Sequence, residues 1–225
     1  MFWESLKSFI LPRLPGKSTQ VLRQMKIKIL RVTKRDLDYF YDKRFATGPL
    51  REKKWAPYFY NLILNKFHPS SVVDFGCGTG DILESFEKNG MEILGIDGSK
   101  ACKKYCRIRS DRFLLYDLRN RLYLEKKYDL CLCIEVAEHI EEKYSDVLIS
   151  NLSSSSCLII FTAAGLRQPG VSHCNLKPHQ WWIEKFKKFG FVLDKESTEW
   201  LREELRGNPD IEKSLVKNWH ILKTR

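Results

Sequence analysis

Short apolar runs alternate with helical stretches from about residue 71 onward. The runs are SVVDF (71–75), EILGI (92–96), RFLLY (112–116), YDLCLCI (128–134) and CLIIFTA (157–163), and the helical stretches lie at about 80–89, 99–108 and 138–152. Continuous rather than alternating apolar runs are typical of strands buried on both faces, as in a parallel sheet covered by helices. The pattern predicts an α/β fold with a doubly wound, mostly parallel sheet and ligands at the carboxyl ends of its strands.

The first part of the chain has a different character. Residues 1–46 are rich in Lys and Arg and are divided by Pro12 and Pro15, and apolar residues at helical spacing near the start suit either an amphipathic surface helix or a packing arm. We predict a basic N-terminal helical extension over 1–46 and one domain over 47–225. No apolar run approaches the roughly 20 residues that span a bilayer, so no transmembrane segment is expected.

Charge and cysteine content narrow the expected partners and compartment. The formal net charge of +11 favours anionic partners such as nucleic acid, acidic glycans, nucleotide-linked substrates or a membrane surface. The chain has 7 cysteines, an odd number, and several of them lie in apolar runs. Such residues are typically reduced core side chains, which predicts a reducing, cytoplasmic location.

A glycine-rich loop follows the first apolar run, in VVDFGCGTGDILESF. Gly76, Gly78 and Gly80 allow a tight turn and close approach of a ligand to the backbone. A dinucleotide-binding loop would have a third glycine at position 81, where this chain has Asp81, and Asp74 precedes the loop. Because a carboxylate repels phosphate, this loop suits a cationic ligand such as S-adenosylmethionine, which carries a sulfonium and an amino group.

Two further acidic residues stand at the ends of the next two runs. Asp97, in LGIDGS, is placed to accept the hydroxyls of a ribose, and Asp117, in LLYDLRN, is placed to accept the amino group of adenine while Leu118 packs on the ring. Three acidic strand ends in order are a stronger signal than a glycine loop alone.

With these motifs the chain resembles the class I S-adenosylmethionine-dependent methyltransferases over about residues 45–222. The resemblance implies a Rossmann-like seven-stranded sheet and cofactor contacts from Asp74, Gly76, Cys77, Gly78, Asp97, Gly98, Asp117, Leu118 and Ile134. Upstream, GPLR resembles the NPLR segment of the ubiquinone-biosynthesis O-methyltransferases. That similarity implies that Arg51 binds the methionine carboxylate of the cofactor, although Arg51 also suits a surface position.

The stretch CIEVAEHIEE carries the candidate chemistry. Glu135, Glu138 and His139 are spaced i, i+3 and i+4, which on an α-helix places them on one face, as a metal site, an acid/base site or a solvated patch. The motif resembles two metal-dependent O-methyltransferase families, the ubiquinone-biosynthesis enzymes and the small-RNA 2′-O-methyltransferases, and the latter add a downstream histidine. Here that residue is His173. We predict a divalent metal, Mg²⁺ or Mn²⁺, on these four residues, with His139, His173 and Glu135 as catalytic residues. Without a metal, His139 or His173 is the candidate base.

The stretch from Ile159 to Phe191 narrows the acceptor. It is similar to bacterial and viral methyltransferases associated with glycan assembly, through Phe161 to Ala164, His173, Asn175, Trp181 and Trp182. Aromatic rings and an Asn suit a sugar, and we expect one tryptophan at the sugar and one in the core. We therefore predict O-methylation of a sugar hydroxyl, with a deoxyhexose as the expected sugar, in a carbohydrate or sugar-nucleotide acceptor. The alternatives are 2′-O-methylation of a terminal ribose in RNA, and a non-catalytic subunit.

Overall fold

A computed structural model describes residues 25–33, 36–48, 52–168, 170 and 172–225. The chain divides into two compact units, Met1–Phe40 and Tyr41–Arg225. The described part of the first unit holds a helix over 25–32 and α3 (Asp36–Phe40), and the ammonium of Lys26 lies 4.3 Å from the centre of the Tyr39 ring. The predicted extension over 1–46 crosses this boundary, because 41–46 pack with the second unit, and its role stays a prediction.

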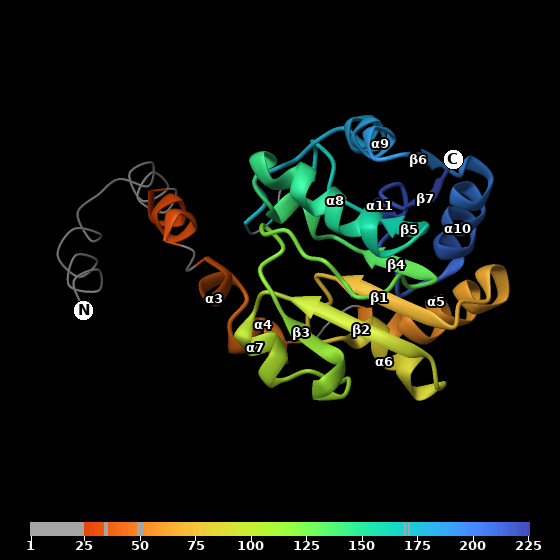
Figure 1. The fold of residues 1–225 in the computed structure, drawn as a ribbon, viewed down its shortest axis with the longest axis horizontal. Coiled ribbons are helices and arrows are strands. Elements are labelled where there is room, and N and C mark those ends of the chain that lie inside the picture. The colour runs from red at the N-terminus through yellow and green to blue at the C-terminus, as the bar shows by residue number, and fades with distance from the viewer. Residues whose placement is uncertain (1–24, 34–35, 49–51, 169, 171) are drawn as a thin grey trace. The chain divides into compact units, whose positions relative to one another are not determined.

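The second unit is built on one seven-stranded sheet, in the order β3-β2-β1-β4-β5-β7-β6 (Figure 1). The strands are β1 (Ser71–Phe75), β2 (Glu92–Asp97), β3 (Phe113–Leu115), β4 (Leu130–Cys133), β5 (Leu158–Phe161), β6 (Phe191–Leu193) and β7 (His220–Thr224). The first five are parallel, and β7 runs antiparallel to both β5 and β6. The predicted mostly parallel, doubly wound α/β sheet is confirmed.

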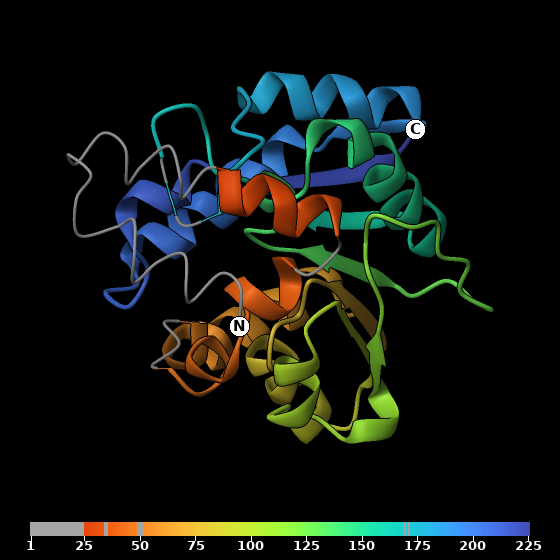
Figure 2. The same cartoon turned by 90° about the vertical axis from the view of Figure 1, so that its left-hand side faces the viewer.

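Helices cover both faces of the sheet, and Figure 2 shows them on either side of the strands. The helices of this unit are α4 (Lys43–Thr47), α5 (Glu52–Phe67), α6 (Asp81–Lys88), α7 (Lys100–Lys104), α8 (Ser145–Ser155), α9 (His179–Lys188), α10 (Lys195–Gly207) and α11 (Lys213–Val216). Val72 and Leu132 pack in one core cluster with α5, α6 and α10, whereas Val73 and Cys131 pack in another with α8 and α9. Adjacent residues of a strand thus face opposite layers, which explains the continuous apolar runs.

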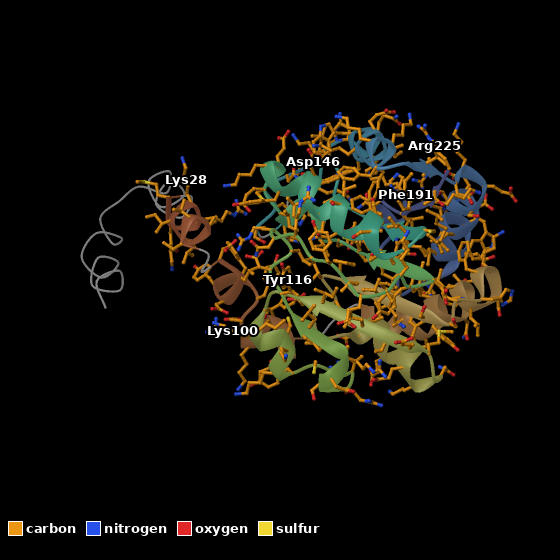
Figure 3. All side chains as sticks on the ribbon, viewed as in Figure 1. Lys28, Lys100, Tyr116, Asp146, Phe191 and Arg225 are labelled. Carbon is orange, nitrogen blue, oxygen red and sulfur yellow. The ribbon has the colours of Figure 1, made fainter. Side chains whose placement is uncertain are left out.

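Polar contacts join helices and loops at the margins of these cores. Asp146, labelled on α8 in Figure 3, forms an ion pair with Lys185 of α9. Tyr116 directly follows β3, and its hydroxyl donates to the carbonyl of Arg121 at 2.6 Å. No helix in the described part of the chain combines the length and apolar character needed to cross a bilayer.

The structure differs from the sequence prediction between β4 and α8. An α-helix was expected over about 138–152, but the chain forms two 3-10 turns, Ala137–His139 and Glu142–Tyr144, and α8 begins only at Ser145. The amide of His139 donates to the carbonyl of Val136 at 3.0 Å, an i to i−3 bond. The buried side chain of Glu138 accounts for the change, because its carboxylate is directed inward to the backbone amide of Ala164.

The last strand brings the C-terminal segment to the functional edge of the sheet. Because β7 is antiparallel to β5, its first residue, His220, pairs with the last residue of β5, Phe161. The turn that precedes β7 therefore lies beside the carboxyl ends of the parallel strands, where ligands bind in open α/β sheets. Asn218, which lies 83 positions downstream of Glu135, contacts the Glu135 side chain in this way.

Candidate functional site

The glycine loop closes onto the neighbouring strand at the end of β1. Gly76 and Cys77 donate their backbone amides to the carbonyl of Ile96, at 2.7 and 3.2 Å. Gly76 has φ 83° and Gly78 has φ 55°, values that disfavour side chains. A Cβ at Gly76 would lie 2.3 Å from Val136, whereas one at Gly78 would meet nothing within 4 Å. The loop thus needs glycine for packing at one position, and leaves open space at the other.

Asp97 is fixed against this loop by two backbone amides. Gly78 donates to its Oδ2 at 2.9 Å and Ser99 donates to its Oδ1 at 2.8 Å. Burial raises the pKa of Asp97 to about 6, and burial together with the charge of Asp97 raises the pKa of Asp74 to about 7. Two desolvated carboxylates in one region favour a ligand that brings positive charge and hydrogen-bond donors.

Asp117 and Leu118 lie after β3, where the adenine end of the cofactor was predicted. Leu118 is buried, and the Asp117 carboxylate forms a two-pronged pair with the Arg119 guanidinium, with Nε and Nη2 each 2.9 Å from a carboxylate oxygen. Arg119 was not singled out by sequence reasoning, although its position two residues after Asp117 was visible. The contact of Asp117 with adenine stays a prediction. In the present structure the Asp117 carboxylate is bound by Arg119.

Three other residues were predicted to contact the cofactor: Gly98, Ile134 and Arg51. Gly98 directly follows β2, and Ile134 directly follows β4 and is partly buried, so both lie at the carboxyl edge of the sheet. Arg51 lies outside the described residues. Their contacts with a cofactor remain predictions.

Gly78→Ala is expected to weaken binding of S-adenosylmethionine by roughly tenfold or more while costing only about 1 kcal/mol of stability. The added methyl group would occupy the open space beside the loop rather than clash with protein atoms. Isothermal titration and thermal unfolding would measure the two effects. Gly90→Ala is the control, since Gly90 also has positive φ and open space but lies outside the loop. Equal cofactor affinity in Gly78→Ala and wild type would contradict the placement of the ligand.

Three of the four predicted metal ligands come together. Glu138, His139 and His173 each offer a ligand atom, and these atoms lie within 4.8 Å of one another. They do not share an α-helical face as expected: the first two lie in a 3-10 turn, and the third comes from the loop before α9. Two backbone bonds hold that loop in place, because Cys174 and Asn175 both donate to the carbonyl of Glu138, at 2.8 and 3.1 Å.

Hydrogen bonds orient both histidine rings. The Nδ1 of His173 lies 2.8 Å from the carbonyl of Gln168, which can only accept, so Nδ1 carries the proton. In the neutral ring, Nε2 of His173 then bears a lone pair. The Nδ1 of His139 lies 2.8 Å from the hydroxyl of Ser172. Such outer bonds are typical of histidines that bind metals, since they fix the tautomer and the ring orientation.

Glu138 provides the test of whether this group suits a cation. Its side chain is fully buried, Oε1 accepts from the amide of Ala164 at 3.1 Å, and Oε2 has no hydrogen-bond partner among the residues that the structure describes. Burial, followed by the charge of Glu135, raises the pKa of Glu138 to about 8. An unsatisfied buried carboxylate oxygen beside two oriented imidazoles fits a divalent ion.

Glu135 stands beside this group rather than in it. The residue has φ 54°, in the left-handed region, and its amide donates to the hydroxyl of Thr162 at 2.7 Å. Its Oε1 accepts from the side-chain amide of Asn218 at 3.2 Å. The α-helical spacing that led to Glu135 was therefore the wrong geometry, although the residue does adjoin Glu138.

The residues expected to contact a sugar divide between the core and its margin. Trp182 is buried and packs on Phe161 with ring centres 5.4 Å apart, as expected for one of the two tryptophans. Asn175 is also buried and donates to the hydroxyl of Ser145 at 3.0 Å, and its contact with a sugar stays a prediction. Trp181 is partly buried, and the ammonium groups of two lysines lie 5.0 and 4.8 Å from its ring centre.

Tyr41 contacts both the region of the glycine loop, beside Asp97, and the region of the metal group, beside His139. The sequence analysis assigned Tyr41 to the N-terminal extension. Its carbonyl accepts from the hydroxyl of Ser99 at 2.7 Å, beside Asp97. Its own hydroxyl lies 3.4 Å from that of Ser172, and its ring meets the His139 ring edge-on at 5.9 Å. No local pattern pointed to Tyr41, because its partners are far away in the sequence.

Comparison with known proteins agrees with the fold. Residues 49–158 match a family model described as a methyltransferase domain. A ubiquinone biosynthesis O-methyltransferase from Rhodopseudomonas palustris (strain BisA53) is 30% identical over 84 residues, 35% of this chain and 33% of the relative. The match thus spans about a third of the length of that curated relative.

Two solved structures share the fold. Magnesium protoporphyrin IX methyltransferase from Synechocystis PCC 6803, solved with bound S-adenosylmethionine, has a TM-score of 0.57 and 18% identity, over 83% of this chain and 92% of that one. A sugar N-methyltransferase from Streptoalloteichus sp ATCC 53650 has a TM-score of 0.57 and 11% identity, over 84% of this chain and 92% of that one. At these identities the comparisons establish the fold.

Proposed function

We propose that this chain, whose residues 49–158 match a family model described as a methyltransferase domain, transfers a methyl group from S-adenosylmethionine to a sugar hydroxyl with the help of a divalent metal ion. The observation that carries the proposal is the group of Glu138, His139 and His173 at the sheet edge that also bears the glycine loop. The O-methyltransferase activity named for the curated relatives supports the same reaction type.

The glycine loop and the metal group have separate proposed roles. Asp74 and Asp97 would bind the cationic and hydroxyl-bearing parts of the cofactor at the glycine loop. Glu138, His139 and His173 would hold the ion, and their one carboxylate and two imidazoles suit Mn²⁺ and also admit Mg²⁺, Fe²⁺, Co²⁺ or Zn²⁺. When bound, the ion supplies a lowered pKa for a hydroxyl of the acceptor and orients its oxygen.

The reaction exchanges one bond for another. The bond between the methyl carbon and sulfur breaks, a bond between that carbon and the acceptor oxygen forms, and sulfur becomes a neutral thioether. The hydroxyl proton must leave as the oxygen attacks. Glu135 is the proposed acceptor of that proton, because its carboxylate adjoins the group without belonging to it.

A sugar is the proposed acceptor because neighbouring hydroxyls can bind one ion together. Nitrogen or carbon methylation needs no such pair of oxygens. The similarity of residues 159–191 to glycan-associated methyltransferases also supports a sugar. Since Asn175 and Trp182 are buried, Trp181 is the remaining aromatic candidate for contact with the sugar.

The decisive experiment measures transfer of labelled methyl groups to paired acceptors. A deoxyhexoside with two neighbouring hydroxyls is compared with its analogue lacking one of them, each with Mn²⁺ and with a chelator. We expect labelling of the first acceptor only, and only with metal. Transfer unaffected by chelator would overturn the metal role. Labelling of short single-stranded RNA instead of either sugar would overturn the sugar acceptor and indicate an RNA acceptor.

A further inference from the structure

Glu135 is the end of a chain of hydrogen-bonded side chains whose other members, Asn218 and His179, have no part in the proposed reaction. The side-chain Nδ2 of Asn218 donates to Oε1 of Glu135 at 3.2 Å, and Oδ1 of Asn218 lies 3.2 Å from Nε2 of His179. A carboxylate only accepts, so the amide nitrogen of Asn218 must face Glu135. Its oxygen must then face His179, whose Nε2 carries the proton. The three side chains therefore allow one consistent set of donors and acceptors.

The turn that carries Asn218 is itself held firmly. Asn218 is fully buried, and its carbonyl accepts from Nδ1 of His220 at 2.7 Å. Nη2 of Arg202 lies 3.2 Å from Nε2 of His220, and burial and the charge of Arg202 lower the pKa of His220 to about 3. His220 is thus neutral, donating on one nitrogen and accepting on the other. Its ring also meets that of His179 edge-on at 5.0 Å.

Glu135 needs such support because its backbone is unfavourable. A non-glycine residue with φ 54° costs about 1–3 kcal/mol relative to ordinary backbone and persists only where surrounding contacts impose it. The bond from its amide to Thr162 fixes the backbone, and the bond from Asn218 fixes the carboxylate. Without the second bond the side chain would be free to turn away from Glu138.

We propose that Asn218 and His179 are positioning residues for Glu135, which hold its carboxylate ready beside the Glu138, His139 and His173 group. His179 acts through Asn218 by fixing the orientation of its amide. The inference rests on the proposed function, because it concerns the same metal group. It adds two residues, one at the start of α9 and one before β7, to the machinery of the site.

The test compares variants of His179 by binding of Mn²⁺ alone, followed by electron paramagnetic resonance. The Glu135 carboxylate adjoins the group without belonging to it, and its charge acts on Glu138, so it attracts a divalent ion through space. We therefore expect His179→Ala, which frees this carboxylate, to weaken Mn²⁺ binding by about tenfold. His179→Gln should restore binding to within about threefold of wild type, because its side-chain amide can also donate to Asn218. Gln180→Ala is the matched control, since Gln180 lies on the same helix and bonds only to Glu184 in the described contacts.

Two further measurements separate positioning from general damage. S-adenosylmethionine affinity and the thermal midpoint of His179→Ala should stay close to wild type, because the cofactor loop is not in the chain of contacts. Unchanged Mn²⁺ affinity in His179→Ala would overturn the positioning role while leaving the metal site intact. Equal weakening in the Ala and Gln variants would also overturn it. A wild-type protein that binds cofactor but no Mn²⁺ would overturn the metal role itself, and this inference with it.

Discussion

Glu138→Gln is expected to reduce methyl transfer by about 10³-fold or more while S-adenosylmethionine affinity stays within about twofold of wild type. The change keeps the shape of the side chain, and the amide oxygen can still accept from Ala164. It removes the negative charge from the carboxylate that lies beside the two histidines. A neutral amide is a poor ligand for a divalent ion in this setting, so the hydroxyl would not be activated. Single-turnover transfer and calorimetric titration of cofactor would measure the two quantities.

The neighbouring residue Glu142 provides the control for this substitution. Glu142 is exposed and forms an ion pair with Lys177 at 2.6 Å, outside the metal group. Glu142→Gln should change transfer by less than about twofold, because exposed ion pairs contribute little. Glu138→Gln with near wild-type activity would refute the role of the carboxylate. The thermal midpoint of Glu138→Gln should not fall, since the substitution replaces a buried carboxyl group whose ionised form burial disfavours.

Cofactor affinity is expected to fall by roughly tenfold or more as pH is lowered from 7.5 to 5. In the cofactor-free protein the pKa of Asp74 is raised to about 7 by burial and by Asp97, so Asp74 is largely protonated at pH 5. A cationic ligand favours the ionised carboxylate, so binding requires loss of that proton below pH 7. The pH range of the titration ends at 7.5 so that the amino group of the cofactor, if its pKa is ordinary, stays mostly charged. Calorimetry in buffers of different ionisation enthalpy would detect the released proton.

Asp74→Asn separates this linkage from other effects of pH. The variant should bind cofactor more weakly at pH 7.5, with a flatter pH profile. It should also be more stable at pH 8, by about 1–3 kcal/mol, because a raised folded pKa means that ionised Asp74 destabilises the fold. That penalty is absent below the unfolded pKa of about 3.8 and develops as pH rises through about 7. A profile as steep as that of wild type would assign the linkage elsewhere, with Asp97 as the next candidate.

The fold could be predicted because its determinants are local and repeated. The run SVVDF forms β1 over the same residues, and EILGI forms most of β2. Strands buried on both faces need apolar side chains at successive positions, and that requirement is visible in any short window of sequence. The glycine loop and Asp97 could be found for the same reason, since they follow their strands directly.

The arrangement of the metal group could not be predicted from spacing. Glu138 turns inward to the amide of Ala164, 26 positions away, and Glu135 is held by Thr162 and Asn218. These contacts replace the α-helix that the i, i+3, i+4 spacing suggested. Asn175 and Trp182 likewise matched a sugar-binding pattern, but the packing of α8 and α9 buries both of them.

The sequence by itself therefore determined which chemical groups the chain brings to the carboxyl edge of its sheet: a glycine loop, acidic strand ends, two glutamates and two histidines. Only the tertiary structure decided which of them meet. Tyr41 enters from the N-terminal side and Asn218 from the turn before an antiparallel strand, and no local pattern marks either residue. The physical reason is range: hydrophobic periodicity acts between neighbours in sequence, whereas the orientation of a buried carboxylate depends on donors supplied by distant segments.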